Sequence, residues 1–117
     1  MAEPIIKTAI PKARYRYGEY VVTFLGDVDS DDSIDYHFLV AVGREEEPKP
    51  GLFLSCENIP VAERTEGAYR LRAMMKDGEQ VLASSDDWKQ YARFESDALD
   101  IISQMLSLTD EQPYKLS

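Results

Sequence analysis

The sequence has a single cysteine, no long apolar run and comparatively few positive charges. Cys56 has no second cysteine with which to form an internal disulfide, and this favours a reduced compartment. The longest apolar run, residues 38–42, is far shorter than the roughly 20 residues of a membrane-spanning helix. The chain also begins without the basic and then apolar segments of a secretory signal. We therefore expect a cytoplasmic protein that does not bind membranes.

Positive charge is scarce and unevenly placed. The 13 lysines and arginines are opposed by 22 acidic residues, which gives a formal net charge of −9. A chain of this charge repels phosphate backbones and anionic lipid surfaces, so we expect no nucleic acid as a partner. Basic residues gather near the start of the chain, where Lys7 and Lys12 precede two arginines. This basic segment either meets an acidic partner or lies beside acidic loops of its own fold.

Signature motifs of common enzyme classes are also absent. The sequence contains no glycine-rich nucleotide loop, no paired-histidine or CxxC metal motif, no catalytic-serine elbow and no kinase motif. His37 and Cys56 lie on adjacent predicted strands, but strand alternation points them to opposite faces, which argues against a thiolate–imidazole nucleophile. We therefore expect no cofactor and favour a protein that is not an enzyme, although the missing motifs do not exclude one.

The clearest structural signal is an amphipathic helix over residues 86–108. A repeat of about 3.6 residues gathers its apolar side chains on one broad side. These side chains are Trp88, Tyr91, Ala92, Ala98, Leu99, Ile102, Met105 and Leu106, and Phe94, Ile101 and Leu108 widen the side. Ser84 or Ser85 can cap the first free N–H groups of the helix. Because the apolar side is wider than a coiled-coil seam, we predict that this helix lies across a sheet.

Strand-like segments fill residues 4–84, ahead of the helix. They cover residues 4–10, 13–26, 34–43, 51–57, 69–76 and 79–84. In residues 34–43, Ile34, Tyr36 and Phe38 are expected on one face, and His37 and Leu39 on the other. We prefer a bulge at Gly18 to a turn there. Asp77-Gly78 is predicted to form a two-residue turn that sets Met75 opposite Gln80.

The connections between these segments are short and contain no crossover helix, which predicts antiparallel pairing of successive strands. We expect an α+β fold in which an antiparallel meander sheet of about five or six strands packs against one long C-terminal helix. Residues 1–117 are expected to form a single domain that ends in a short C-terminal tail.

The second face of the predicted sheet, away from the helix, is less polar than a solvent-exposed face. Val21, Leu25, Leu39 and Phe53 are expected to point there. One helix cannot cover both faces. Either the sheet curls, or the N-terminal segment covers this face, or another chain does. An apolar face with a charged rim is typical of a partner or dimer surface.

Four arginines could add a charged patch to this surface. Arg14 and Arg16 share one strand face, and so do Arg70 and Arg72. If their two strands are neighbours, the four guanidinium groups could bind a partner that carries carboxylates or phosphates. The alternative is that they are ordinary solvent-facing charges.

Glu95 is unusual because it lies within the apolar side of the predicted helix, between Tyr91 and Leu99. A carboxylate in that position must be paired, hydrogen-bonded or protonated. One hypothesis is a ligand pocket between sheet and helix, where Glu95, Tyr91 and His37 supply the polar groups. The alternative is a salt bridge or a hydrogen bond from a tyrosine.

The acidic segment that begins at Asp27 places carboxylates at alternate positions, Asp27, Asp29 and Asp31, as calcium-binding loops do. The match is partial, because the sixth position is Asp32 instead of glycine and the twelfth is Phe38 instead of glutamate. The alternative to a weak metal site is a solvated loop, and we assign no metal.

Together these features favour a non-enzymatic protein-interaction module of the adaptor, inhibitor or chaperone type. Its partner would be another protein or a second copy bound through the second sheet face. The alternative is a small-molecule-binding protein or enzyme with a pocket around Glu95. A third hypothesis is an ion sensor that uses the acidic segment.

Overall fold

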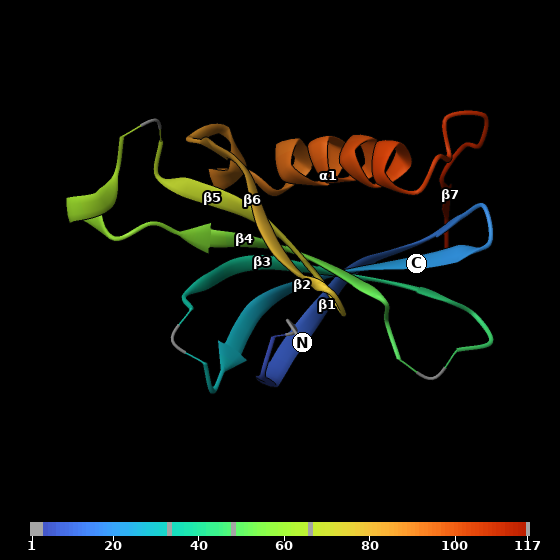
Figure 1. Cartoon of the computed structure of the whole chain (residues 1–117), viewed down its shortest axis with the longest axis horizontal. Helices are drawn as coiled ribbons and strands as arrows, with labels where there is room; N and C mark the ends of the chain where they lie inside the picture. The colour runs from blue at the N-terminus through green and yellow to red at the C-terminus, as the bar shows by residue number, and fades with distance from the viewer. Residues whose placement is uncertain (1–3, 33, 48, 66, 117) are drawn as a thin grey trace.

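The structure of the protein is a computed structural model that describes residues 4–32, 34–47, 49–65 and 67–116. In these ranges the chain forms a seven-stranded antiparallel sheet with one α-helix, α1 (Tyr91–Met105), above it (Figure 1). The strands are β1 (Ile6–Tyr17), β2 (Tyr20–Ser30), β3 (Tyr36–Arg44), β4 (Leu52–Asn58), β5 (Tyr69–Met75), β6 (Gly78–Ser85) and β7 (Tyr114–Lys115). Two short 3-10 turns are η1 (Val61–Glu63) and η2 (Asp87–Lys89).

The strand order across the sheet is β6-β5-β4-β3-β2-β1-β7. Strands β1 to β6 follow one another as a meander, and β7 returns to pair with β1. The antiparallel sheet with a helix is therefore confirmed, but the sheet is larger than predicted. Within the described ranges, no helix has the length and the apolar character needed to cross a bilayer.

The helix is shorter than the predicted range of residues 86–108. Gln90 has an extended backbone, with φ −92° and ψ 126°, and it separates η2 from α1. The Ser85 hydroxyl accepts a hydrogen bond from the Asp87 N–H at 3.0 Å, at the start of η2, and the N-cap of α1 is Gln90 instead of a serine. Trp88 holds this turn against the helix by donating to Asp97 at 2.9 Å. At the other end, α1 stops before Ser107, whose φ is +56°.

Two predicted turns are also corrected. Gly18 is part of a tight turn, with Tyr17 opposite Tyr20, and is not a bulge in one long strand. Its φ of +59° is a conformation that glycine adopts at little cost. In the β5–β6 hairpin, Lys76 and Asp77 form the turn, and Met75 lies opposite Gly78 instead of Gln80.

The main core lies between α1 and the sheet. Phe24 of β2 and Phe38 of β3 contact Phe94 of the helix, with ring centroids 6.0 and 5.2 Å apart. Ala98 and Ile102 continue the buried stripe of α1 into the same cluster. Burial of large apolar side chains from both layers is what holds the helix on the sheet.

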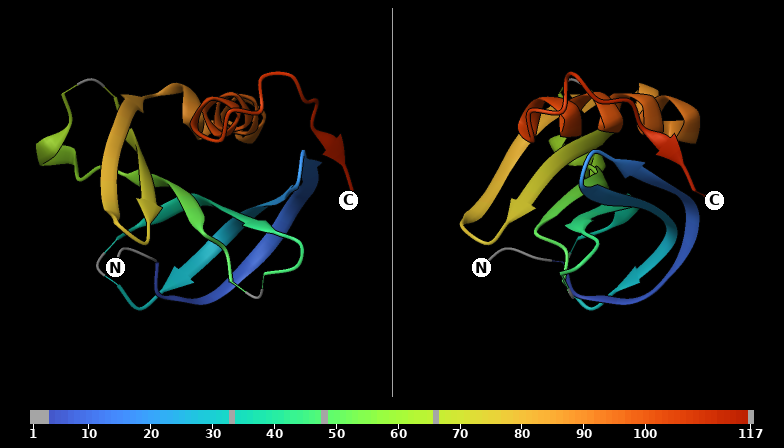
Figure 2. Two further views of the ribbon diagram at one scale, coloured as in Figure 1. Left: turned by 45° about the vertical axis from the view of Figure 1, so that its right-hand side comes forward. Right: turned by 90° about the vertical axis from the view of Figure 1, so that its right-hand side faces the viewer.

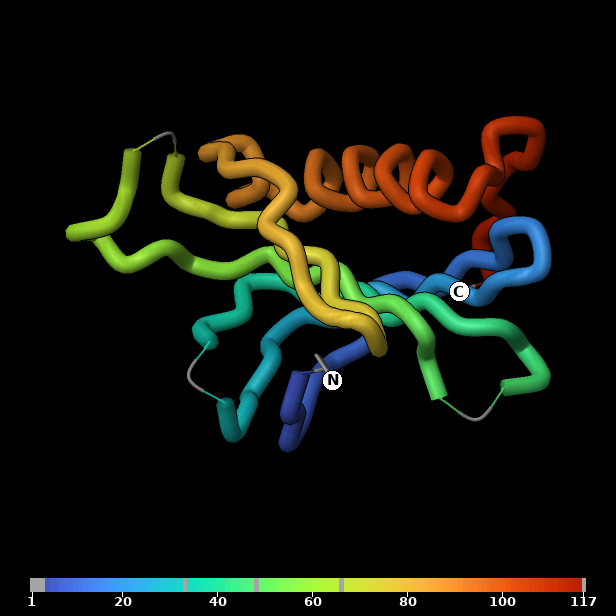
Figure 3. The backbone as a smooth tube through the Cα atoms, in the orientation of Figure 1, coloured from blue at the N-terminus to red at the C-terminus, as the bar shows by residue number. Residues whose placement is uncertain are grey.

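A second, smaller cluster lies on the opposite face of the sheet. Tyr36, Leu39 and Met74 are buried there, and Ile6 of β1 and Val28 of β2 are among the side chains packed against them. The curvature of β1 and β2, visible in Figure 2, accompanies several irregularities in their pairing. Figure 3 follows the chain after α1 (red) back to the turn between β1 and β2 (blue).

Candidate functional site

The expected interaction face is partly covered by the chain itself. Leu39 is buried in the second cluster, while Val21, Leu25 and Phe53 remain half-buried. The predicted placement of Tyr36 on the helix side was wrong. A register shift between Tyr36 and Phe38 turns Tyr36 into the second cluster. The chain therefore covers Leu39 itself, and a smaller apolar surface remains beside it.

The four arginines do not form one patch. Strands β2, β3 and β4 separate β1 from β5, so the condition for a shared patch, that the two arginine-bearing strands are neighbours, is not met. Arg14 is exposed, and Arg16 pairs with Glu45 at 2.8 Å. Arg70 and Arg72 instead face Glu57 on the neighbouring strand β4.

Glu57 is the centre of an ion-pair network that the sequence analysis missed. Glu57 is 4% exposed, and its carboxylate accepts hydrogen bonds from Arg72 Nε at 2.7 Å and from Ser55 Oγ at 2.7 Å. Arg70 Nη1 lies 4.0 Å away, and Arg72 also binds Glu79 at 2.7 Å. The sequence signal was present, because β4 and β5 each carry polar residues at alternate positions. The network thus pairs Glu57, Arg72 and Glu79 within the fold.

Glu95 is engaged by two tyrosines. Tyr15 and Tyr91 donate to its two carboxylate oxygens at 2.7 and 2.5 Å. Burial, with the Glu95 hydrogen bond and charge, raises the pKa of Tyr15 to about 12 and raises the pKa of Tyr91 as well. Both phenols therefore remain neutral donors. Of the two hypotheses for Glu95, these contacts favour a carboxylate held by tyrosine hydrogen bonds over a carboxylate that binds a ligand.

The contacts of His37 are with η2 and β5. Its Nε2 lies 3.2 Å from the carbonyl oxygen of Lys89, and its ring stacks on Tyr69 at 4.7 Å. Cys56 is fully buried in the main core, and burial, aided by the charge of Glu57, raises the pKa of its thiol to about 12. A thiolate nucleophile is therefore disfavoured at neutral pH.

The acidic segment is used structurally. Asp31 pairs with Lys7 at 3.2 Å, and Asp32 accepts hydrogen bonds from the Ile5 N–H at 3.1 Å and the Tyr36 hydroxyl at 2.8 Å. Asp27 and Asp29 are exposed along β2. Among the residues that the structure describes, no three histidine, cysteine or acidic side chains are grouped so that they could hold a metal ion.

A pocket of about 460 Å³ lies where the ends of the central strands meet the C-terminal end of α1. We call it the end pocket. Its lining residues are Tyr20, Val42, Gly43, Arg44, Glu47, Gly51, Leu52, Met75, Met105 and Leu106. Val42 and Leu52 are buried, whereas Met75 and Met105 are 38% and 37% exposed. The end pocket is thus lined by buried apolar side chains and by two methionines that solvent can reach.

The polar groups of the end pocket are few. Arg44 lies over the Tyr20 ring, with its guanidinium carbon 5.6 Å from the ring centroid, and pairs with Glu19 at 3.0 Å. Glu47 supplies a carboxylate beside it. This arrangement can bind an apolar group, with charged side chains at the edge. No sequence pattern indicated it, because its lining comes from separate elements.

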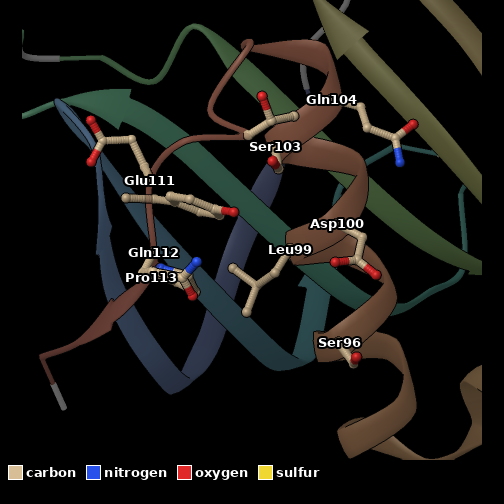
Figure 4. A pocket seen from close by; sticks show the side chains of 10 residues that line it. Ser96, Leu99, Asp100, Ser103, Gln104, Glu111, Gln112 and Pro113 are labelled. Carbon is tan, nitrogen blue, oxygen red and sulfur yellow. The ribbon is translucent and has the colours of Figure 1, made fainter.

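A groove of about 470 Å³ runs between α1 and the segment that follows it (Figure 4). Asp100 and Gln104 lie on the helix side, and Glu111 and Gln112 lie across from them. Its lining is largely polar and exposed, with Tyr17 and Leu99 as the main apolar contributions. Exposed amides and carboxylates of this kind are already satisfied by water, so the end pocket is the stronger candidate site.

Comparison of the chain with models of known protein families, with curated proteins and with solved structures found no match.

Proposed function

We propose that the protein is a non-enzymatic protein-interaction module that binds an apolar side chain of a partner protein in the end pocket. The observation that carries this proposal is the pair of exposed methionines, Met75 and Met105, above the buried walls formed by Val42 and Leu52. Methionine is flexible and polarizable, and it is frequent on surfaces that adapt to apolar partners.

The state of the titratable side chains supports binding over catalysis. Glu57 and Glu95 are held by arginine or tyrosine partners, and the Cys56 thiol is buried. Groups that are satisfied within the fold stabilise it and are poorly placed to exchange protons with a substrate. A binding surface needs no such reactive group.

The charge of the chain defines the chemistry of the partner. A formal net charge of −9 favours a partner with lysine or arginine residues beside its apolar anchor. Glu47 at the edge of the end pocket is an exposed carboxylate for such a residue. The adaptor, inhibitor and chaperone types all fit this description, and the half-buried Val21, Leu25 and Phe53 offer a smaller additional surface.

A photo-crosslinking experiment tests the proposal. A photoreactive residue in place of Met105, in the full chain and in its native cell, should give a discrete adduct with a partner protein. The adduct should disappear when Met75→Lys narrows and charges the pocket. A photoreactive residue at Val61, which is 78% exposed in η1 and does not line the pocket, is the control. Equal adducts at both positions, or an adduct that Met75→Lys leaves unchanged, would refute the proposal.

A small apolar ligand is the second candidate occupant. The volume of about 460 Å³ lies within the range of small-molecule sites, and it supports this alternative. The alternative differs from the earlier hypothesis, because the end pocket lies at the opposite end of α1 from Glu95. Native mass spectrometry of the purified protein distinguishes the two: a bound small molecule that is lost in Met105→Lys would favour the ligand.

A further inference from the structure

We propose that the outer edge of β6 is a self-association site, where β6 pairs antiparallel with β6 of a second copy and joins the two sheets. This proposal is independent of the end pocket. Among the residues that the structure describes, β6 is the last strand on one side of the sheet, and Figure 2 shows it at the margin. Since antiparallel pairing alternates, some of its N–H and C=O groups turn away from β5.

The two margins of the sheet differ in how they resist pairing with another strand. β1 carries Pro11, Lys7 and Lys12, its pairing with β2 is irregular in three places, and β7 covers it at Tyr15 and Arg16. Prolines, lysines, irregular pairing and short covering strands are the usual devices that protect an edge. β6 spans eight residues without lysine or proline. Its pairing with β5 is irregular at one place, where Leu71 pairs with Ala83 and Arg72 with Val81, so that Leu82 is an extra residue in β6.

The charge of β6 favours a second copy as the occupant. Its single charged residue, Glu79, already pairs with Arg72 of β5 at 2.7 Å. Two β6 strands can therefore meet without bringing unpaired like charges together, although the whole chain carries a formal net charge of −9. A two-fold symmetric contact uses the same strand of both copies, so β6 itself supplies both sides of the contact.

The sequence on either side of β6 selects a register. Val81 is 49% exposed and lies near the middle of the strand, so we place it opposite Val81 of the second copy. This register sets the end of β6 that follows Lys76 beside the end of the other copy's β6 that precedes Asp86. Both residues are exposed and lie just outside the strand, and Asp86 also accepts a hydrogen bond from the Ala68 N–H at 2.8 Å, so opposite charges flank each end of the contact. The two helices then lie on the same face of the joined sheet.

Sedimentation and light scattering of the full chain over a range of concentrations test the proposal. The unmodified protein should form a dimer, and Val81→Lys should weaken it by at least roughly tenfold, since it sets two like charges opposite each other. Val61→Lys, at an exposed position away from β6, should leave the dimer unchanged. Val21→Lys tests the second sheet face. A protein that stays monomeric, or a dimer lost with Val21→Lys and kept with Val81→Lys, would overturn the proposal.

Cysteine substitution gives a second measurement that does not depend on weakening the contact. Val81→Cys should form a disulfide-linked dimer on mild oxidation, because the two sulfurs are opposite each other, whereas Val61→Cys should not. Cys56 is fully buried and does not compete. Equal cross-linking at both positions would contradict the β6 pairing. A synthetic peptide of residues 78–85 should compete with the dimer, and binding of that peptide to a protein that never dimerises would exclude self-association.

Discussion

Replacing Arg72 by methionine should destabilise the fold strongly, because the change leaves the Glu57 carboxylate buried without its main cation. The side chains of Glu57 and Arg72 are 5% and 17% exposed, and they are joined by a 2.7 Å contact. Removing one partner of a buried ion pair costs about 3–5 kcal/mol. Since water reaches part of Arg72, we expect a loss of about 2–4 kcal/mol in the free energy of unfolding.

Arg70→Met is the matched control. Arg70 is on the same strand and faces the same carboxylate, but its side chain is 26% exposed and the closest approach is 4.0 Å. A weak, partly exposed pair of this kind contributes about 0–1 kcal/mol. The two arginine variants therefore remove the same charge and the same donor group at two distances from Glu57.

Urea unfolding followed by circular dichroism measures the difference. With a urea dependence of roughly 1.5 kcal/mol per molar, Arg72→Met should lower the midpoint by about 2 M, and Arg70→Met by less than about 0.7 M. Adding Glu57→Met to Arg72→Met should restore at least half of the lost stability, because no buried charge remains. Equal shifts for the two arginine variants, or no recovery in the double variant, would refute the assignment of Glu57 as a buried charge.

Three further predictions concern the clusters and the turn. Stability should fall as the pH rises from about 10 to about 12, since the folded pKa of Tyr15 lies above its unfolded value; Tyr15→Phe should reduce this loss in pH-dependent melting. Gly18→Ala should cost about 1–2 kcal/mol, since φ is +59° and the new Cβ would lie 2.9 Å from Leu108; an unchanged melting temperature would contradict this. Leu39→Ala should cost about 2–4 kcal/mol in urea unfolding, and a loss below 1 kcal/mol would show that the second cluster is not a core.

Local pattern was enough to identify most elements. The alternation in residues 34–43 and the periodicity around residues 91–105 are properties of consecutive side chains, and both elements formed there. Short connections were enough to predict antiparallel pairing. The errors fell where local alternatives are close in energy. The choice between a bulge and a turn at Gly18 depended on the pairing of Tyr17 with Tyr20, and the register after Asp77 depended on the partner strand.

The candidate site was less accessible to sequence reasoning than the fold. Tyr91 and Glu95 were correctly placed together, because residues four apart on a helix are neighbours, but Tyr15 comes from β1 and was not foreseen. The end pocket combines Tyr20, Leu52 and Met105 from three separate elements. Only the path of the chain brings such residues together, and no spacing in the sequence records it.

The sequence by itself determined the antiparallel pairing of successive strands, the apolar side of α1 and the formal net charge of −9. These depend on residue type and on short-range spacing. The tertiary structure alone decided that Leu39 is covered, that Glu57 is neutralised by Arg72, and that the arginines of β1 and β5 stay apart. The physical reason is that burial and pairing depend on which strands are neighbours and how the sheet curves, and both arise from contacts between residues distant in the chain.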